Sequence, residues 1–300
     1  VAVAMSGGGD SAGAALLLQR AGHRVSGVTL RLHPYRDRPG LCGSAEDIEM
    51  AQTVAAALSI PHTVLDLSEQ FRTAVMDPFV SAYVHGRTPN PCIDCNRAIK
   101  FGALMDWAID QGADCMATGH YARVRYDGAS GRWLLLRGLD RRKHQSYVLY
   151  QLTQRQLSRL LLPIGDYDKA AIREMAAQAG LRNAGKADSQ DICFVPDGDY
   201  VSFLQGYGGV ELRGGDFVDL SGRVLGRHKG QEAYTIGQRK GLGISADAPL
   251  YVVRKDLETG AVVLGPDSAL YTTELTAERM NWISISRIVA MSFCGPRSWV

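Results

Sequence analysis

Three consecutive glycines between a serine and an aspartate, "SGGGDS" at Ser6–Ser11, constrain the fold of this chain more than any other feature. The apolar residues 1–5 before them predict a short buried strand. After them, apolar side chains recur with helical spacing on one face: Ala14, Leu17, Leu18 and Ala21. Gly22 stands where such a helix would end. The glycines therefore occupy a turn from a strand into a helix.

A glycine-rich turn of this kind is suited to holding phosphate. Glycine allows a ligand to approach the backbone closely, and the first amides of the helix point outwards without an internal partner. The structural alternative is a tight turn capped by Asp10 or Ser11. The turn does not match the P-loop of other nucleotide-binding proteins, because no lysine follows the glycines.

The rest of the chain predicts an α/β domain followed by a small β domain. Expected strands cover residues 24–32, 62–67 and 114–118, and expected helices cover 45–58, 68–85 and 96–111. This alternation predicts a parallel sheet with helices on both faces and ligands at the carboxyl ends of its strands. From about Gly206 the pattern changes to short strands separated by glycines, with a hairpin turn at Thr259-Gly260.

Composition narrows the class of protein further. The chain has 300 residues, of which 46% are hydrophobic, so it can bury a sizeable core. No apolar run is long enough to span a bilayer and no cleavable leader pattern opens the sequence, which favours a cytoplasmic protein without membrane partners. With a net charge of only +2, a nucleic-acid surface must be a local patch. One such patch contains Arg223, Arg227, His228, Lys229, Arg239 and Lys240, although these side chains could also form an ordinary solvated face.

The six cysteines are scattered, which argues for thiol or metal chemistry rather than a secreted disulfide framework. Cys92 and Cys95 lie in "GRTPNPCIDCN", where we expect Asn96 to cap the following helix and the helix dipole to favour thiolates. The Cys-x-x-Cys spacing alone is compatible with half a zinc site, a redox pair or two ligands of an iron–sulfur cluster. Of the single cysteines, Cys193 has the most polar surroundings, and Cys115 is expected in the core. Cys42 and Cys294 have no informative neighbours.

Several motifs in order resemble one family of enzymes. The "SGGGDS" loop resembles the pyrophosphate loop of ATP-pyrophosphatases, which adenylate a substrate and release pyrophosphate. It is followed by "GRTPNPCIDCN", "ATGHYARV", "KHQSYVLYQL", "DSQDICF" and "YTIGQRKGLGI". Together they closely resemble the tRNA-specific 2-thiouridylases, which insert sulfur into the wobble uridine of the anticodon. The resemblance covers nearly the whole chain and implies a nucleotide-binding domain like the adenine nucleotide alpha hydrolases over residues 1–197, a small β domain over 198–272 and the start of a C-terminal β-barrel over 273–300.

The resemblance also implies roles for particular residues. ATP would be bound by Ala4, Met5, Ser6, Gly7, Gly8, Gly9, Asp10, Ser11, Leu30 and Gly119, with Asp10 near pyrophosphate-bound Mg²⁺. The target base would lie against Asn90, Pro91 and Cys92, and tRNA would contact His120, Lys143, His144 and Gln145. Cys193 would receive a persulfide from a donor protein or cysteine desulfurase, and Cys95 would supply the second thiol of the disulfide by-product. The family acts on lysine, glutamate and glutamine tRNAs.

Five departures from the family pattern bear on these expectations. Gly9 and Ala12 replace the valine and serine common in the loop, which predicts weaker ATP binding. Cys92 replaces an aspartate found in some members, so Cys92, Cys95 and Cys193 could instead hold a four-iron, four-sulfur cluster. His144 replaces the usual aspartate. The sequence "RIVAMSFCGPRSWV" departs from the usual continuation and predicts a truncated or divergent barrel.

Two other functions are compatible with parts of the sequence. Another ATP-pyrophosphatase, acting on a small metabolite, would need the loop but neither Cys95 nor Cys193. A non-catalytic, metal-holding RNA-binding protein would use the cysteines only to stabilise the fold. Exchange of pyrophosphate with ATP, measured with and without tRNA, separates the three functions.

Overall fold

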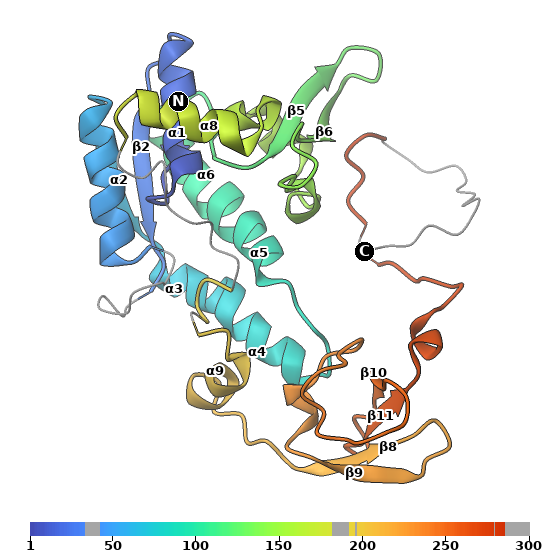
Figure 1. Ribbon diagram of the computed structural model, residues 1–300. Helices are drawn as coiled ribbons and strands as arrows, with labels where there is room; N and C mark the ends of the chain where they lie inside the picture. The colour runs from blue at the N-terminus through green and yellow to red at the C-terminus, as the bar shows by residue number, and fades with distance from the viewer. Residues whose placement is uncertain (34–42, 182–191, 196, 279, 286–300) are drawn as a thin grey trace.

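The computed structural model describes residues 1–33, 43–181, 192–195, 197–278 and 280–285. Figure 1 shows a larger sheet surrounded by helices at one end of the molecule and a smaller sheet at the other, with α4 running from one towards the other. The predicted α/β domain followed by a β domain is therefore present. Cys42, Cys294 and most of "DSQDICF" lie outside the described residues.

The larger sheet is parallel, with strand order β3-β2-β1-β4-β7. Its strands are β1 (Ala2–Ala4), β2 (Ser26–Arg31), β3 (His62–Asp66), β4 (Met116–Ala117) and β7 (Leu160–Leu161). The first four fall where the sequence predicts them, whereas β7 was not expected. Side chains alternate along β1, so that Ala2 packs into the core on one face of the sheet and Val3 into the core on the other.

Helices cover both faces of this sheet, as predicted. On one face lie α1 (Gly9–Arg20), α2 (Ala45–Ala57) and α8 (Lys169–Gln178), whose small apolar side chains pack with Val3. On the other face lie two long helical stretches. The first comprises α3 (Ser68–Phe71), a π-helical segment (Arg72–Met76) and α4 (Asp77–Val84). The second comprises α5 (Pro91–Asp94), a longer π-helical segment (Cys95–Leu104) and α6 (Met105–Asp110).

The helix that carries Cys95 begins earlier than predicted. Asn96 does not cap it: its side chain is buried and donates a hydrogen bond from Nδ2 to the carbonyl oxygen of Val148 at 3.1 Å. The helix starts at Pro91, and Asn90 is the cap, because its Oδ1 accepts a hydrogen bond from the backbone N–H of Cys92 at 3.1 Å. Proline suits the first turn of a helix and asparagine the position before it, so Asn-Pro is itself the start signal.

A two-stranded hairpin, β5 (Ala122–Asp127) and β6 (Arg132–Arg137), follows the sheet edge and leads to α7 (Gln154–Ser158). Residues near the end of the chain pack against this region. Asn281 donates hydrogen bonds to the carbonyls of Tyr150 and Leu152, and Arg132 donates to the carbonyls of Trp282 and Ile283. Within residues 273–278 and 280–285 there is no helix or strand, so the start of a barrel stays a prediction.

The smaller sheet has strand order β10-β11-β8-β9. Its strands are β8 (Gly215–Val218), β9 (Val224–His228), β10 (Tyr251–Lys255) and β11 (Val262–Gly265), and its core includes Phe217, Val252 and Leu264. The predicted turn joins β10 to β11, with Gly260 at φ 73°. Tyr83 at the end of α4 stacks on Tyr200 of α9 (Tyr200–Gly206). The centroid of the Tyr83 ring lies 5.9 Å from the ammonium of Lys255 in β10, so this tyrosine connects the helices of the larger sheet to the smaller sheet.

No helix in the part of the chain that the structure describes has the length and apolar character needed to cross a bilayer.

Candidate active site

The glycine-rich turn joins β1 to α1 as predicted. Gly7 has φ 70° and lies against α2, where a Cβ on it would come within 2.6 Å of the carbonyl oxygen of Asp47. Any side chain here would therefore push the turn away from α2. Gly8 caps α1 without a side chain, and α1 begins at Gly9. The first amides of α1 are thus available at the carboxyl edge of the sheet.

Two serine hydroxyls lie at the two ends of this turn. The Ser11 hydroxyl donates to the carbonyl of Gly8 at 3.0 Å and accepts from the backbone N–H of Ser6 at 3.2 Å. Ser11 is only 4% exposed, whereas Ser6 is exposed. Ser11 therefore fixes the shape of the turn, and Ser6 is the hydroxyl that faces solvent.

Asp10 forms the strongest polar contact of the site with Lys169, a residue that the sequence analysis missed. The Lys169 ammonium lies 2.7 Å from each carboxylate oxygen of Asp10, and the Tyr121 hydroxyl donates to the same carboxylate at 2.9 Å. The lysine side chain is 12% exposed and the aspartate side chain 29%. A positive charge thus stands at the mouth of the loop, where phosphate would lie.

Lys169 is the first residue of α8, which follows β7 at the edge of the parallel sheet. Asp168 caps this helix by accepting a hydrogen bond from the N–H of Ala171 at 2.8 Å. The sequence "PIGDYDKAAIREMAAQAG" contains this cap and a closing glycine, so the helix could have been found. The pairing with Asp10 could not, because 159 residues separate the two.

Gly119 and Leu30 lie at the same edge of the sheet. A Cβ on Gly119 would come within 2.7 Å of the backbone of Asp10 and Ser11, so only glycine lets this segment pack against the loop. Leu30 is near the end of β2, and its carbonyl oxygen is approached closely by Gly43. These two residues thus flank the turn, with Ala4 and Met5 at the end of β1 between them.

His120 is buried at this edge and is held in a neutral form. Its Nδ1 is 2.7 Å from the Thr118 hydroxyl, and its ring lies beside Phe101. Burial, assisted by the nearby Lys100 ammonium, lowers the pKa of His120 well below its usual value. A neutral imidazole acts through hydrogen bonds rather than through charge, and the predicted contact of His120 with tRNA stays a prediction.

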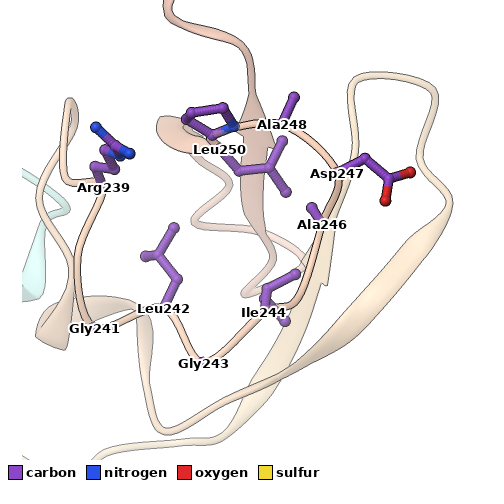
Figure 2. Close-up of a pocket in the computed structure, with 10 residues that line it drawn as sticks. Arg239, Gly241, Leu242, Gly243, Ile244, Ala246, Asp247, Ala248 and Leu250 are labelled. Atoms are coloured by element: carbon purple, nitrogen blue, oxygen red, sulfur yellow. The ribbon is translucent and has the colours of Figure 1, made fainter.

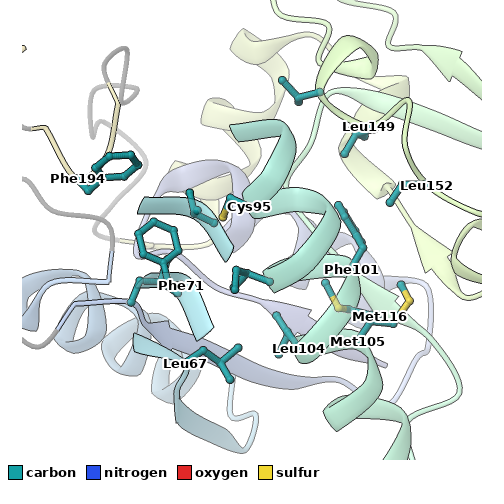
Figure 3. Close-up of a cluster of buried hydrophobic side chains, with 14 of the residues drawn as sticks. Leu67, Phe71, Cys95, Phe101, Leu104, Met105, Met116, Leu149, Leu152 and Phe194 are labelled. Carbon is teal, nitrogen blue, oxygen red and sulfur yellow. The ribbon is translucent and has the colours of Figure 1, made fainter. Parts of the chain in front are cut away.

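The two cysteines predicted to take part in sulfur transfer lie against one apolar cluster, and Figure 3 shows Cys95 in it. Cys95 is 8% exposed and belongs to the core around Phe71 and Phe101, and Cys193 packs against the same core. Phe194, next to Cys193, contacts Phe71 edge to face at 5.8 Å between ring centroids. Cys92 is exposed. Cys115, expected in the core, is only half-buried, because it precedes β4 rather than lying within it.

The segment 143–148, which includes the residues predicted to contact tRNA, connects the helix that carries Cys95 with the glycine-rich turn Ser6–Ser11. The side chain and backbone of Gln145 both bond to Tyr121, at 3.0 and 2.8 Å, and the Tyr121 hydroxyl reaches Asp10. Val148, three residues further on, accepts the hydrogen bond from Asn96 beside Cys95. His144 keeps a buried Nδ1 that has no hydrogen-bond partner among the described residues, and its ring meets Tyr147 edge-on. Gln145 thus lies between the glycine-rich turn and the helix that carries Cys95.

The basic patch of the β domain is smaller than predicted. His228 is buried, with its ring bonded to the backbone of Gly230 and Gly260, so it belongs to the core. Arg223 and Arg227 form ion pairs with Asp219 and Asp216 at 3.0 and 2.8 Å. Lys229, Arg239 and Lys240 are exposed and have no carboxylate partner in the described part of the chain.

The motif "YTIGQRKGLGI" contributes to a cavity of 390 Å³ in the same domain. Leu242, Ile244 and Leu250 provide apolar walls, and Figure 2 shows Arg239 and Asp247 on opposite sides of the cavity. The remaining positive charge of the motif, Lys240, follows Arg239 in the sequence and is exposed.

Comparison with known proteins shows to which family this chain belongs. A family described as "tRNA methyl transferase HUP domain" matches residues 1–197, and one described as "tRNA methyl transferase PRC-barrel domain" matches residues 201–266. A protein of Heliobacterium modesticaldum called tRNA-specific 2-thiouridylase MnmA is 49% identical over 295 residues, which cover 97% of this chain and 76% of that protein. This chain belongs to the tRNA-specific 2-thiouridylase family. Proteins of the same name from Carboxydothermus hydrogenoformans and Acetivibrio thermocellus are 48% and 44% identical, over 96% of this chain and 80% and 82% of theirs.

Membership of the 2-thiouridylase family confirms the resemblance drawn from the motifs, and the parallel sheet fits use of ATP. The iron–sulfur alternative fits less well. Within the described residues, which include Cys92, Cys95 and Cys193, no three His, Cys, Asp or Glu side chains are grouped as a metal site. Cys92 is exposed, whereas Cys95 is buried in an apolar cluster.

Proposed function

We propose that this chain catalyses ATP-dependent 2-thiolation of the wobble uridine in the tRNA anticodon. The observation that supports this most directly is the segment 143–148, which links Asn96, beside Cys95, to Tyr121, which binds Asp10. A nucleotide site and a thiol site held by one segment suit a reaction that activates a base and then delivers sulfur to it.

The first step is adenylation of the base. The C2 oxygen of uridine is a poor leaving group and must be activated before sulfur can replace it. This oxygen attacks the α-phosphorus of ATP, which releases pyrophosphate and joins the base to AMP through the C2 oxygen, so that AMP becomes the leaving group. The amides of Gly8 and Gly9 and the Ser6 hydroxyl would hold the leaving phosphates, and Lys169 would add positive charge beside them. Mg²⁺ arriving with ATP would neutralise further charge, with Asp10 as the carboxylate at the loop, since Mg²⁺ is usually held by one or two carboxylates and substrate phosphates.

The second step is sulfur transfer. The terminal sulfur of a persulfide on Cys193 attacks C2 and displaces AMP, which leaves the base joined to Cys193 through two sulfur atoms. The Cys95 thiolate then attacks the sulfur of Cys193, forming a Cys95–Cys193 disulfide and releasing the 2-thiouridine. An external thiol reductant resets the pair. The target base would leave the anticodon stack to reach Asn90–Cys92.

The substrates and partners are part of the same proposal. The acceptors would be the lysine, glutamate and glutamine tRNAs, and the persulfide would come from a sulfur-carrier protein or a cysteine desulfurase. The direct test incubates the protein with tRNA, ATP and a sulfide source and measures 2-thiouridine by mass spectrometry. Release of pyrophosphate without any requirement for tRNA would indicate a small-metabolite substrate instead.

The exposed cations of the β domain provide a first prediction. Replacing Arg239 and Lys240 together by glutamine should weaken tRNA binding and lower the slope of log K against log salt by roughly two, because each lost phosphate contact contributes about 0.9. Arg223→Gln is the control, since this arginine is paired with Asp219 and should change the slope little. Equal slopes in the double variant and wild type would assign both cations to an ordinary solvated face.

A further inference from the structure

A basic pocket adjoins the Asp10–Lys169 pair, and apart from Lys169 its charged residues have no role in the steps above. It has a volume of 640 Å³ and is formed by residues 139–142 and the first turns of α8. Its charged lining consists of Arg141, Arg142, Lys169 and Arg173 together with Asp140 and Asp168. We call this the α8 pocket.

Both carboxylates of the α8 pocket are engaged by backbone N–H groups. Asp140 accepts hydrogen bonds from the N–H of Arg142 at 2.9 Å and of Lys169 at 3.3 Å, and Asp168 caps α8. These contacts shape the loop and tie it to the helix. They do not place either carboxylate in an ion pair with an arginine of the pocket.

Among the described residues, the three arginines of the pocket form no ion pair, although the Arg142 guanidinium is close enough to Asp140 to lower the pKa of that carboxyl. Arg141, Arg142 and Arg173 are exposed, and none has a carboxylate within ion-pair distance in the part of the chain that the structure describes. Lys169, in contrast, is directed at both oxygens of Asp10. Arginine presents a planar set of donors that matches phosphate, and a group of unpaired arginines around a cavity is suited to a phosphate oxyanion.

The position of the pocket favours RNA over the nucleotide as the source of that phosphate. Residues 139–142 run directly into Lys143–Gln145, the segment tied to Tyr121. The loop that would hold ATP phosphates is largely buried at Gly7 and Ser11, whereas the three arginines are exposed. A polyanion lying over the surface can reach them while its target base enters the site.

We propose that the α8 pocket binds a backbone phosphate of the RNA substrate and thereby fixes the position of the RNA relative to Asp10 and Lys169. This inference rests on the proposed function. It assigns Arg141, from the segment 139–142, and Arg173, from α8, as the principal phosphate contacts.

The test compares Arg141→Gln/Arg173→Gln with Arg20→Gln/Arg24→Gln. The second pair removes the same charge from exposed arginines at the far end of α1 and just beyond it. With unmodified tRNA and no ATP, the pocket variant should bind about tenfold more weakly and lose roughly two from its salt slope, while the control keeps the wild-type slope. Far-UV circular dichroism checks that both variants are folded.

A second arm measures binding of inorganic pyrophosphate and the KM for ATP. Both should be unchanged in the pocket variant. A raised KM for ATP with unchanged tRNA binding would assign the pocket to nucleotide phosphates and overturn the proposal, as would a salt slope equal to that of the control. Thiolation by the wild-type protein is measured separately, so failure of the proposed function would be distinguished from failure of the pocket.

Discussion

Cys193→Ser and Cys95→Ser should each abolish catalytic formation of 2-thiouridine, while Cys92→Ser should retain most of it. In the proposed route Cys193 carries the sulfur to be transferred and Cys95 breaks its bond to the carrier, so neither could be replaced by a hydroxyl. Cys92 is exposed, and in this route it lies against the base but transfers no sulfur. Mass spectrometry of tRNA nucleosides after incubation with ATP and a persulfide donor, without added thiol reductant, measures the outcome, with Cys115→Ser as a control for loss of a thiol elsewhere.

The Cys95→Ser variant also separates two forms of the persulfide route. If the terminal sulfur attacks C2 directly, this variant should accumulate tRNA joined to Cys193, and added reductant should release 2-thiouridine from it. If Cys95 instead expels free sulfide that attacks C2, no covalent complex forms. Equal loss of activity in the three variants Cys92→Ser, Cys95→Ser and Cys193→Ser, with iron present in the wild-type protein, would overturn both forms in favour of a cluster.

The local elements of the fold could be predicted from the sequence because their signals are local. The helical spacing from Ala14 to Ala21 gives α1, and the turn before it follows from the glycines. The sequence places the start of the helix that carries Cys95 too late, because asparagine at position 96 is a common capping residue. Asn90-Pro91 is the stronger signal for a helix start. The side chain of Asn96 donates a hydrogen bond to the carbonyl of Val148 instead, and no pattern within its own helix indicates that contact.

The parts of the site that the sequence did not show depend on contacts between distant residues. From the sequence alone, Lys169 is a surface lysine at the start of a helix. In the structure, β7 places that helix beside the glycine-rich turn, and Lys169 pairs with Asp10. His228 reads as a basic surface residue beside Arg227 and Lys229, but alternation along β9 turns it into the core. The local sequence does not show whether such a basic side chain is exposed or engaged, because Asp10, which pairs with Lys169, and Gly260, which bonds to His228, lie elsewhere in the chain.

Asp10→Ala should reduce pyrophosphate release to background, and Lys169→Met should reduce it by at least about a hundredfold, the usual effect of removing one group that stabilises charge developing in a transition state. The two groups face each other at 2.7 Å at the mouth of the loop, and the lysine side chain is 12% exposed, so its charge acts with little screening by water. Tyr121→Phe removes only one hydrogen bond to Asp10 and provides the graded comparison.

Loss of folding could imitate this result, because each single change leaves the other charge without its partner. Asp10→Asn/Lys169→Met removes both charges and should fold like the wild type by circular dichroism, yet it should remain inactive if these groups act on pyrophosphate. Recovery of pyrophosphate release in the double variant would mean that the pair only stabilises the fold. Unchanged release in Asp10→Ala would contradict the assignment of Ser6–Ser11 as the pyrophosphate loop.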